Sequence, residues 1–427
     1  MTKIKPFRAV IYNQQRIGDL SLVVCPPYDI ISVTKQDYYH SLNPYNFIYI
    51  LLGKDIPNED KYQRAGMYFR DWLKEGIFIQ DDRPAIYFYS QRYNLKGEKR
   101  TRIGFIALLH LEEDNPSIFP HEHTHLEPKM DRLRLLEEVK ANLSPIFVLF
   151  SDKKRIIQQI NQNYISKKKP FISVVDEDKI LNELWRIDSP EIIEQICKKM
   201  QDTNIFIADG HHRYEVASIY SQKMNCLYGS LSKEDDFNYI MSYFTNIESA
   251  GLTILPIHRL VKIDSNYNIK NLYRKLSDYF ELQPIKDKER FYFLKEKAGR
   301  NEHVLGMYRD KTFWLLRLKN VKILDKIILD KSLEYRRLNI SILNYIILEN
   351  ILGLDHYDQN FITFSPDAEE IIKKVDSNDS YIGFFLNPVR VEQLISVALN
   401  KERMPPKSTY FYPKLLSGLV INKFNLK

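Results

Sequence analysis

The spacing of apolar and polar residues changes repeatedly along this chain, between the alternation typical of strands and the three-to-four-residue spacing typical of helices. Residues 85–94 and 100–111 alternate around a turn that contains Gly97, which predicts a β-hairpin. Other short apolar runs predict strands at 7–12, 20–24, 145–150, 204–208, 254–261, 303–309 and 312–318. Helical spacing predicts helices at 33–42, 60–75 and 131–142, the first of them capped by the Ser32 hydroxyl.

Strands and helices follow one another throughout, which predicts an α+β (mixed α/β) fold rather than a helical bundle or a sandwich. A chain of 427 residues exceeds what one hydrophobic core usually supports, so several domains are expected. Changes in pattern place three regions at 1–150, 151–250 and 251–427.

Composition narrows the class of protein. Hydrophobic residues make up 44% and charged residues 27%, which is typical of a compact globular chain. The net charge of +7 is dispersed, and this argues for a phosphorylated small molecule as partner rather than nucleic acid. Three cysteines without a CxxC pair fit the reducing cytoplasm and argue against structural zinc. An apolar leader and a membrane-spanning run are both missing from the sequence, so a cytoplasmic location is expected.

The most informative segment is the junction after the apolar run at 204–208. Asp209 and Gly210 end the predicted strand, and His211, His212 and Arg213 then open a predicted helix. A helix N-terminus carries partial positive charge and attracts anions, and three basic residues there are favourable mainly if an anion offsets them. We therefore predict a phosphate site at Gly210, His212 and Arg213. Asp209, as helix cap, metal ligand or proton acceptor, and His211 and His212 are the catalytic candidates; a solvated first turn is the alternative.

A second polar segment, HEHTH at 121–125, contains the H-E-x-x-H pattern of zinc proteases. Pro120 and Pro128 flank it too closely for the long helix that such a site needs, so no zinc is expected and the metal, if any, stays unidentified. A loop is predicted instead, in which alternate histidines share one side. Its candidate residues are Glu122 or His121 as general base, His123 and Thr124 in the pocket, and Lys129 and Arg132 as phosphate-binding cations. An ordinary polar loop is the alternative.

Two proline-stiffened turns offer further candidates. CPPYD at 25–29 places Tyr28 and Asp29 at a pocket, or Asp29 in a simple turn. MPPKSTYFYPK places Lys407, Ser408 and Thr409 at a phosphate, although the glycines of a P-loop are missing, and Lys414 can join the same anion site. His258 and Arg259 can line this pocket, or His258 can be a structural histidine.

The segment IADGHHRYEVA at 207–217 resembles the phosphate-binding turn shared by ParB-type nucleotidases, sulfiredoxins and ADP-dependent free-serine kinases. Sulfiredoxins have a cysteine where this chain has His211, so their redox chemistry is not implied. The kinase form, Asp-Gly-His-His-Arg, fits residues 209–213 without a gap. This resemblance implies a ParB-like core that receives nucleotide phosphates.

Six ordered blocks together resemble the domain of unknown function 1015 family. The blocks are KPFRAVIYN, CPPYDIIS, PHEHTHLEPKMDRLRLL, ADGHHRYE, LPIHRLV and MPPKSTYFYPKLLSGL. This resemblance covers nearly the whole chain and indicates membership of the family, but it implies no particular reaction.

These observations predict a phosphotransferase acting on a small hydroxyl metabolite such as serine or phosphoserine, with ADP or ATP and Mg²⁺. A phosphatase using the same anion site, and a nucleotide- or nucleic-acid-binding ParB-like protein without turnover, are the alternatives. Membrane partners are not expected, and the sequence leaves the oligomeric state open.

Overall fold

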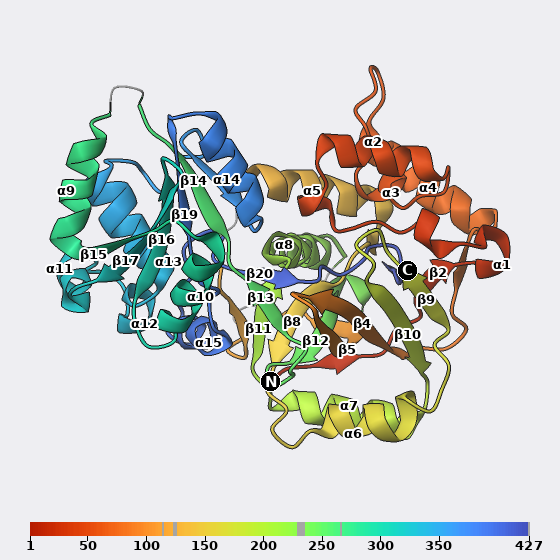
Figure 1. The fold of residues 1–427 in the computed structure, drawn as a ribbon. Coiled ribbons are helices and arrows are strands. Elements are labelled where there is room, and N and C mark those ends of the chain that lie inside the picture. Colours follow the sequence, from red (N-terminus) through yellow and green to blue (C-terminus); the bar gives the residue numbers. More distant parts are fainter. Residues whose placement is uncertain (113–114, 123–125, 229–234, 265–266, 426–427) are drawn as a thin grey trace. The chain divides into compact units, whose positions relative to one another are not determined.

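The computed structural model describes residues 1–112, 115–122, 126–228, 235–264 and 267–425. The fold is mixed α/β, as predicted, and the chain divides into two compact units (Figure 1). The first unit comprises Met1–Pro120, Thr124–Thr253 and Pro413–Lys427, and the second comprises His121–His123 and Ile254–Tyr412.

A nine-stranded mixed sheet organises the first unit. Its strands run in the order β6-β11-β8-β12-β5-β4-β10-β9, with β1 paired to β5. Their bounds are β1 (Ile4–Lys5), β4 (Ile86–Leu95), β5 (Glu98–His110), β6 (Ile118–Pro120), β8 (Ile146–Phe150), β9 (Ile172–Val175), β10 (Leu181–Ile187), β11 (Ile205–Asp209) and β12 (Tyr239–Asn246). β11 pairs parallel with β6 and β12 pairs parallel with β8, whereas the other pairs described in this sheet are antiparallel. The predicted hairpin is confirmed, since β4 and β5 pair as far as Leu95 opposite Glu98.

Helices and two small sheets complete the first unit. The helices are α1 (Gln14–Ile17), α2 (Val33–Leu42), α3 (Ile48–Leu51), α4 (Lys61–Lys74), α5 (Leu126–Val139), α6 (Ile156–Ile160) with the π-helix η3 (Asn161–Ile165), α7 (Pro190–Gln201) and α8 (His211–Tyr228), besides the 3₁₀ turns η1 (Leu20–Leu22), η2 (Tyr28–Ile30) and η4 (Asp236–Asn238). The small sheets are β2 (Val10–Tyr12) with β3 (Phe78–Gln80), and β7 (Ala141–Asn142) with β21 (Asn422–Lys423). Ser32 caps α2 through Lys35 N, as predicted.

The strand predicted at 20–24 is wrong. The Asp19 carboxylate accepts a hydrogen bond from Ser21 N and starts a 3₁₀ turn at Leu20. Such local side-chain bonds compete with strand pairing, and an apolar run of five residues does not reveal them.

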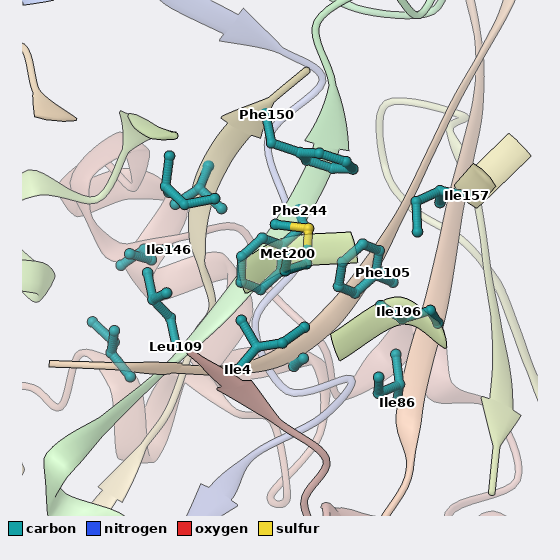
Figure 2. Close-up of a cluster of buried hydrophobic side chains, with 14 of the residues drawn as sticks. Ile4, Ile86, Phe105, Leu109, Ile146, Phe150, Ile157, Ile196, Met200 and Phe244 are labelled. Atoms are coloured by element: carbon teal, nitrogen blue, oxygen red, sulfur yellow. The ribbon is translucent and has the colours of Figure 1, made fainter. Parts of the chain in front are cut away.

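The core of the first unit lies between the sheet and helices α6 and α7 (Figure 2). Phe105 of β5 and Phe244 of β12 stack with ring centroids 4.9 Å apart, and Phe150 meets Phe105 edge-on. Ile196 and Met200 of α7 pack against the same cluster. In Figure 1, α6 and α7 lie along the lower side of the sheet and α8 lies above it.

The second unit contains a six-stranded antiparallel sheet in the order β15-β17-β16-β19-β14-β18. Its strands are β14 (His258–Lys262), β15 (Phe280–Ile285), β16 (Val304–Arg309), β17 (Thr312–Leu318), β18 (Ile362–Ser365) and β19 (Tyr381–Phe385), and a separate pair joins β13 (Thr253–Leu255) to β20 (Tyr410–Tyr412). Its helices are α9 (Ile269–Tyr279), α10 (Lys288–Ala298), α11 (Leu324–Ile327), α12 (Leu333–Arg336), α13 (Asn339–Ser341), α14 (Ala368–Ser377) and α15 (Val391–Leu399), with the 3₁₀ turn η5 (Val321–Ile323) and the π-helix η6 (Ile342–Ile351). The strands predicted at 303–309 and 312–318 are confirmed. The single strand predicted at 254–261 is instead divided into β13 and β14, because Pro256 between them has no backbone N–H to donate.

The predicted boundaries at 150 and 250 differ in how they lie relative to the two units of the fold. The boundary at 250 lies close to Thr253, where the chain leaves the first unit. The boundary at 150 falls at the end of β8, inside the nine-stranded sheet. Residues 413–427 return to the first unit, where β21 pairs with β7. Among the described residues, none of the helices combines the length and the apolar character that a bilayer crossing requires.

Candidate functional site

The predicted strand–turn–helix junction is present. β11 ends at Asp209, Gly210 has φ of +90°, and α8 begins at His211. Tyr214 N donates to Gly210 O at 3.0 Å, so Gly210 accepts the first hydrogen bond of the helix. A Cβ at Gly210 would lie 2.9 Å from the Arg213 guanidinium and 2.9 Å from Ile146 Cγ2. Glycine is therefore required here for both its φ and its lack of a side chain.

Two cations share the Asp209 carboxylate. Lys414 Nζ donates to Asp209 Oδ1 at 2.6 Å, and Arg213 Nη2 donates to Asp209 Oδ2 at 3.2 Å. All three side chains are less than a fifth exposed. The sequence left open whether Lys407 or Lys414 joins this site, and in the structure it is Lys414 that reaches the turn. Two positive groups against one carboxylate leave a net positive charge at the start of α8, where the helix dipole is also positive.

The same contacts determine the ionisation of Asp209. Burial alone raises the pKa of this carboxyl, but Lys414 and Arg213 outweigh burial and lower the pKa to about 2. Asp209 is therefore a carboxylate at neutral pH. Because both of its oxygens accept hydrogen bonds from cations and its basicity is low, it is suited to holding Lys414 and Arg213 in place rather than to accepting a proton.

Arg213 is held more firmly than the sequence indicates. Besides Asp209, it donates from Nη1 to Pro145 O at 2.6 Å. Its Nε is buried and has no hydrogen-bond partner among the described residues. Both terminal nitrogens of the guanidinium thus donate hydrogen bonds to the protein, while the buried Nε donor remains to be satisfied.

A pocket of about 60 Å³ adjoins Arg213. Tyr28 from the CPPYD segment, Arg132 from α5 and apolar residues of α5 and α8 line it. The Arg132 guanidinium lies 4.3 Å from the centre of the Tyr28 ring and donates to Leu51 O at 2.8 Å. Burial raises the pKa of Tyr28 to about 12, so its hydroxyl is protonated at neutral pH and can donate a hydrogen bond. The pocket holds about two water molecules at about 30 Å³ each, so a ligand can place only a small group in it.

The remaining candidates near α8 have their own partners. Lys129 Nζ lies 3.1 Å from Glu215 Oε2, which joins α5 to the first turns of α8. His211 is buried and His212 is half-buried, whereas Asp29 is exposed. Three segments far apart in sequence, CPPYD, α5 and the stretch around Lys414, therefore meet the junction within the first unit.

Lys414 owes its position to two residues that the sequence analysis missed. Gln91 Nε2 donates to Lys414 O at 2.9 Å, and Arg102 donates to Pro413 O and to Gln91 Oε1. Arg102 is fully buried, with its guanidinium 4.7 Å from the centre of the Phe147 ring. A polar residue in an alternating strand looks solvent-facing, so the pattern of β5 gave no signal of this role.

A second group of predicted residues lies in the second unit. Lys407 N donates to Glu122 Oε1 at 3.2 Å, and Arg403 donates to Glu122 O at 2.8 Å. His121 Nε2 lies 3.3 Å from Thr409 Oγ1. Ser408 is buried and donates to Pro405 O, while the Lys407 side chain is exposed. His121 and Glu122 therefore contact the MPPKST segment within the second unit.

His258 and Arg259 extend this group from β14. Arg259 is buried and donates to Lys407 O at 3.0 Å and to Ile257 O at 2.7 Å. His258 Nδ1 accepts from Leu386 N at 3.2 Å, and burial, with the nearby cations, lowers its pKa well below 6.5. His258 therefore serves as a neutral hydrogen-bond acceptor, and Arg259 holds the 406–407 backbone.

The other residues of the HEHTH segment, His123, Thr124 and His125, lie outside the described residues. α5 begins at Leu126, five residues before the predicted start at Asp131. Pro128 is tolerated because the N–H groups of a first helical turn have no partner within the helix. The part of the chain that the structure describes contains no cluster of three or more His, Cys, Asp or Glu residues placed to hold a metal ion.

A family model described as "Protein of unknown function (DUF1015)" matches residues 4–341. The chain belongs to this family. The DUF1015 match includes the junction at Asp209 and the Glu122 segment, and it ends before the stretch that carries Lys407 and Lys414. No curated protein matches the chain.

Comparison with solved structures finds only weak similarities to this DUF1015 protein. A free serine kinase in complex with AMP is 14% identical, with 69% of this chain and 84% of that chain covered and a TM-score of 0.33. A conserved hypothetical protein from Pyrococcus furiosus is 13% identical (70% and 89% covered, TM-score 0.32). C-terminally truncated SbnI from Staphylococcus aureus is 11% identical (74% and 86% covered, TM-score 0.36). Similarities at this level assign neither a ligand nor a reaction to the chain.

Proposed function

We propose that the first unit binds a phosphate group at the start of α8, and that the protein is a phosphotransferase acting on a small hydroxyl metabolite with ADP or ATP. The observation that carries the proposal is the sharing of one carboxylate, Asp209, by Lys414 and Arg213. Phosphoryl transfer consists largely of positioning cations around oxygens that carry charge in the transition state. A net positive charge at a helix N-terminus meets that requirement.

Each side chain has a defined part in this proposal. Lys414 and the unsatisfied Nε of Arg213 contact the phosphate oxygens, and Asp209 holds both cations in register. The Tyr28 hydroxyl, which stays protonated at neutral pH, donates to a phosphate or metabolite oxygen. In this proposal the backbone N–H groups at Gly210 and His212, at the N-terminus of α8, donate to the phosphate. Lys129 and Arg132 supply positive charge from α5.

The pocket volume limits what enters it. Sites for whole ligands of drug size occupy about 300–1,000 Å³, whereas this pocket has about 60 Å³. The pocket therefore admits at most a small group of the ligand beside Arg213, and the proposal places the rest of the ligand outside it. The choice of serine derivatives and adenine nucleotides follows the likeness of residues 209–213 to the kinase form of the turn.

Both oxygens of Asp209 already accept a hydrogen bond from a cation, so the proposal does not use Asp209 as a metal ligand. Mg²⁺ commonly binds through substrate phosphates with few protein ligands. In this proposal Mg²⁺ enters with the nucleotide.

The proton of the accepting hydroxyl passes to His211 or His212, because a carboxylate with a pKa of about 2 is a poor base. Glu122 and His121 remain candidates for a role in the second unit.

Phosphorylation of serine tests the reaction class. Purified protein incubated with serine, ADP or ATP, and Mg²⁺ is expected to produce phosphoserine, because the serine hydroxyl accepts the terminal phosphoryl group of the nucleotide. A parallel incubation with phosphoserine alone tests for hydrolysis. Chromatographic detection of phosphoserine and nucleotides, with an assay for inorganic phosphate, provides the measurement. Release of inorganic phosphate without ADP would establish the phosphatase alternative. Binding without any turnover, with an affinity for DNA that falls steeply with salt, would establish the non-catalytic alternative.

A further inference from the structure

A second concentration of positive charge lies in the first unit, away from the α8 junction. Loop residues Lys153 and Lys154, before α6, and Lys198 and Lys199, near the end of α7, line a hollow of about 510 Å³ together with Ser151 and Gln195. In Figure 1, α6 and α7 lie on the side of the sheet opposite α8. The dispersed charge of the sequence gave no sign of this cluster, because its two halves are more than 40 residues apart.

The charge of this hollow is not balanced by its lining. All four ionisable side chains that line it are lysines. Lys153, Lys154 and Lys198 form no hydrogen bond or ion pair with any described residue, and Glu194, one helical turn before Lys198, forms no ion pair within 4 Å. Like charges gathered in a concave surface repel one another, so an anion that enters the hollow gains from all of them.

The acidic groups of the neighbouring loop have structural tasks. Asp152 is buried and accepts from Ile157 N at 2.8 Å. Glu248 accepts from Ser151 Oγ at 2.6 Å and from Asp152 N at 3.1 Å. These bonds fix the loop that carries Lys153 and Lys154. Lys199 is fixed as well, since its Nζ donates to Ser151 O and to Thr203 Oγ1, each at 3.2 Å.

The volume and the type of cation indicate the ligand class. A hollow of about 510 Å³ lies within the range of small-molecule sites, about 300–1,000 Å³. Lysine binds phosphate as a point charge without the geometric selectivity of arginine, so the cluster selects for charge rather than shape. A compact group of four cations suits several phosphates in one small molecule better than the spaced phosphates of a nucleic acid strand.

We propose that this lysine hollow is a second anion-binding site, for a small molecule that carries two or more phosphate groups. The site is separate from the phosphate site proposed at α8 and does not depend on it. Its ligand adds negative charge to the four lysines and joins the 151–156 loop to α7.

Calorimetric titration of the full chain with tripolyphosphate tests this site. Replacing Lys153, Lys154 and Lys198 with glutamine is expected to weaken tripolyphosphate binding at least tenfold. The matched control replaces Lys262, Lys270 and Lys373, three exposed lysines of the second unit, with glutamine, which removes the same charge and is expected to leave the affinity unchanged. The Lys414→Met variant is expected to retain the binding.

Four results would overturn the proposal. The first is that the parent chain binds no tripolyphosphate at millimolar concentration. The second is that the control variant loses as much affinity as the hollow variant, which would indicate a general charge effect. The third is loss of binding in Lys414→Met, which would move the ligand to the α8 junction. A single-stranded 20-mer that binds more tightly than tripolyphosphate would identify the hollow as a nucleic-acid surface instead.

Discussion

Replacing Asp209 with alanine is expected to destabilise the protein by about 3 kcal/mol, in the range for breaking a buried ion pair from one side. The substitution leaves Lys414 and Arg213 close together without the carboxylate that they share. Denaturant unfolding of the full chain measures the effect. Glu137→Ala is the matched control, because Glu137 pairs with Lys223 at an exposed position, and its expected cost is below about 1 kcal/mol. Equal losses in the two variants would contradict the role given to Asp209.

The lowered pKa of Asp209 predicts how the stability of the folded protein responds to acid. The pKa of Asp209 is lowered from 3.8 to about 2, so its stabilising contribution is present above about pH 4 and is lost as the pH falls towards 2. The contribution amounts to about 2 kcal/mol at about 1.4 kcal/mol per pKa unit. Asp209→Asn is expected to lack this component, so its stability should fall less than that of the parent chain between pH 4 and pH 2.

Arg102→Met is expected to cost about 3 kcal/mol of stability and to weaken phosphate binding at α8. Methionine fills much of the buried volume, but Gln91 Oε1 and Pro413 O lose their donor, and each buried unsatisfied acceptor costs about 1–3 kcal/mol. Loss of the bond to Pro413 also loosens the backbone that presents Lys414. Denaturant unfolding and ligand titration together separate this positioning role from a purely structural one, because a merely structural residue would leave the affinity of the folded protein unchanged.

Arg92→Met provides the control for this experiment. Arg92 is about half exposed and pairs with the buried Glu183 of the neighbouring strand, so its replacement removes one donor to a buried carboxylate and is expected to cost less than Arg102→Met, which removes donors to two buried acceptors. If Arg102→Met were as stable as Arg92→Met and bound ligand like the parent chain, the proposed support of Lys414 would be wrong.

Local sequence signals predicted the local structure well. The junction of β11 and α8 follows from an apolar run, a glycine and helical spacing, all within fifteen residues. The helix cap at Ser32 follows from one side chain. The false strand at 20–24 shows the limit of this approach, since a single Asp19 bond decided the outcome.

Long-range contacts could not be predicted in the same way. The bond between Lys414 and Asp209 joins residues 205 positions apart, and the Arg102 contact with Pro413 spans 311 positions. The sequence correctly indicated the basic residues of the site. It could not reveal that one Arg213 nitrogen donates a hydrogen bond to Pro145 O. The candidates around Glu122 and Lys407 contact each other, yet they belong to the second unit, a grouping that only the fold defines.

Calorimetric titration of the parent chain and of Lys414→Met with ADP and with phosphoserine tests the central claim most directly. The account predicts that the parent binds at least one of them and that Lys414→Met binds it about 10- to 150-fold more weakly, as expected for one charge-assisted hydrogen bond of about 1.5–3 kcal/mol. Lys223→Met, which removes a charge from the exposed side of α8, should bind like the parent. Equal affinities of Lys414→Met and the parent, or a parent chain that binds neither compound, would contradict a phosphate site at this junction.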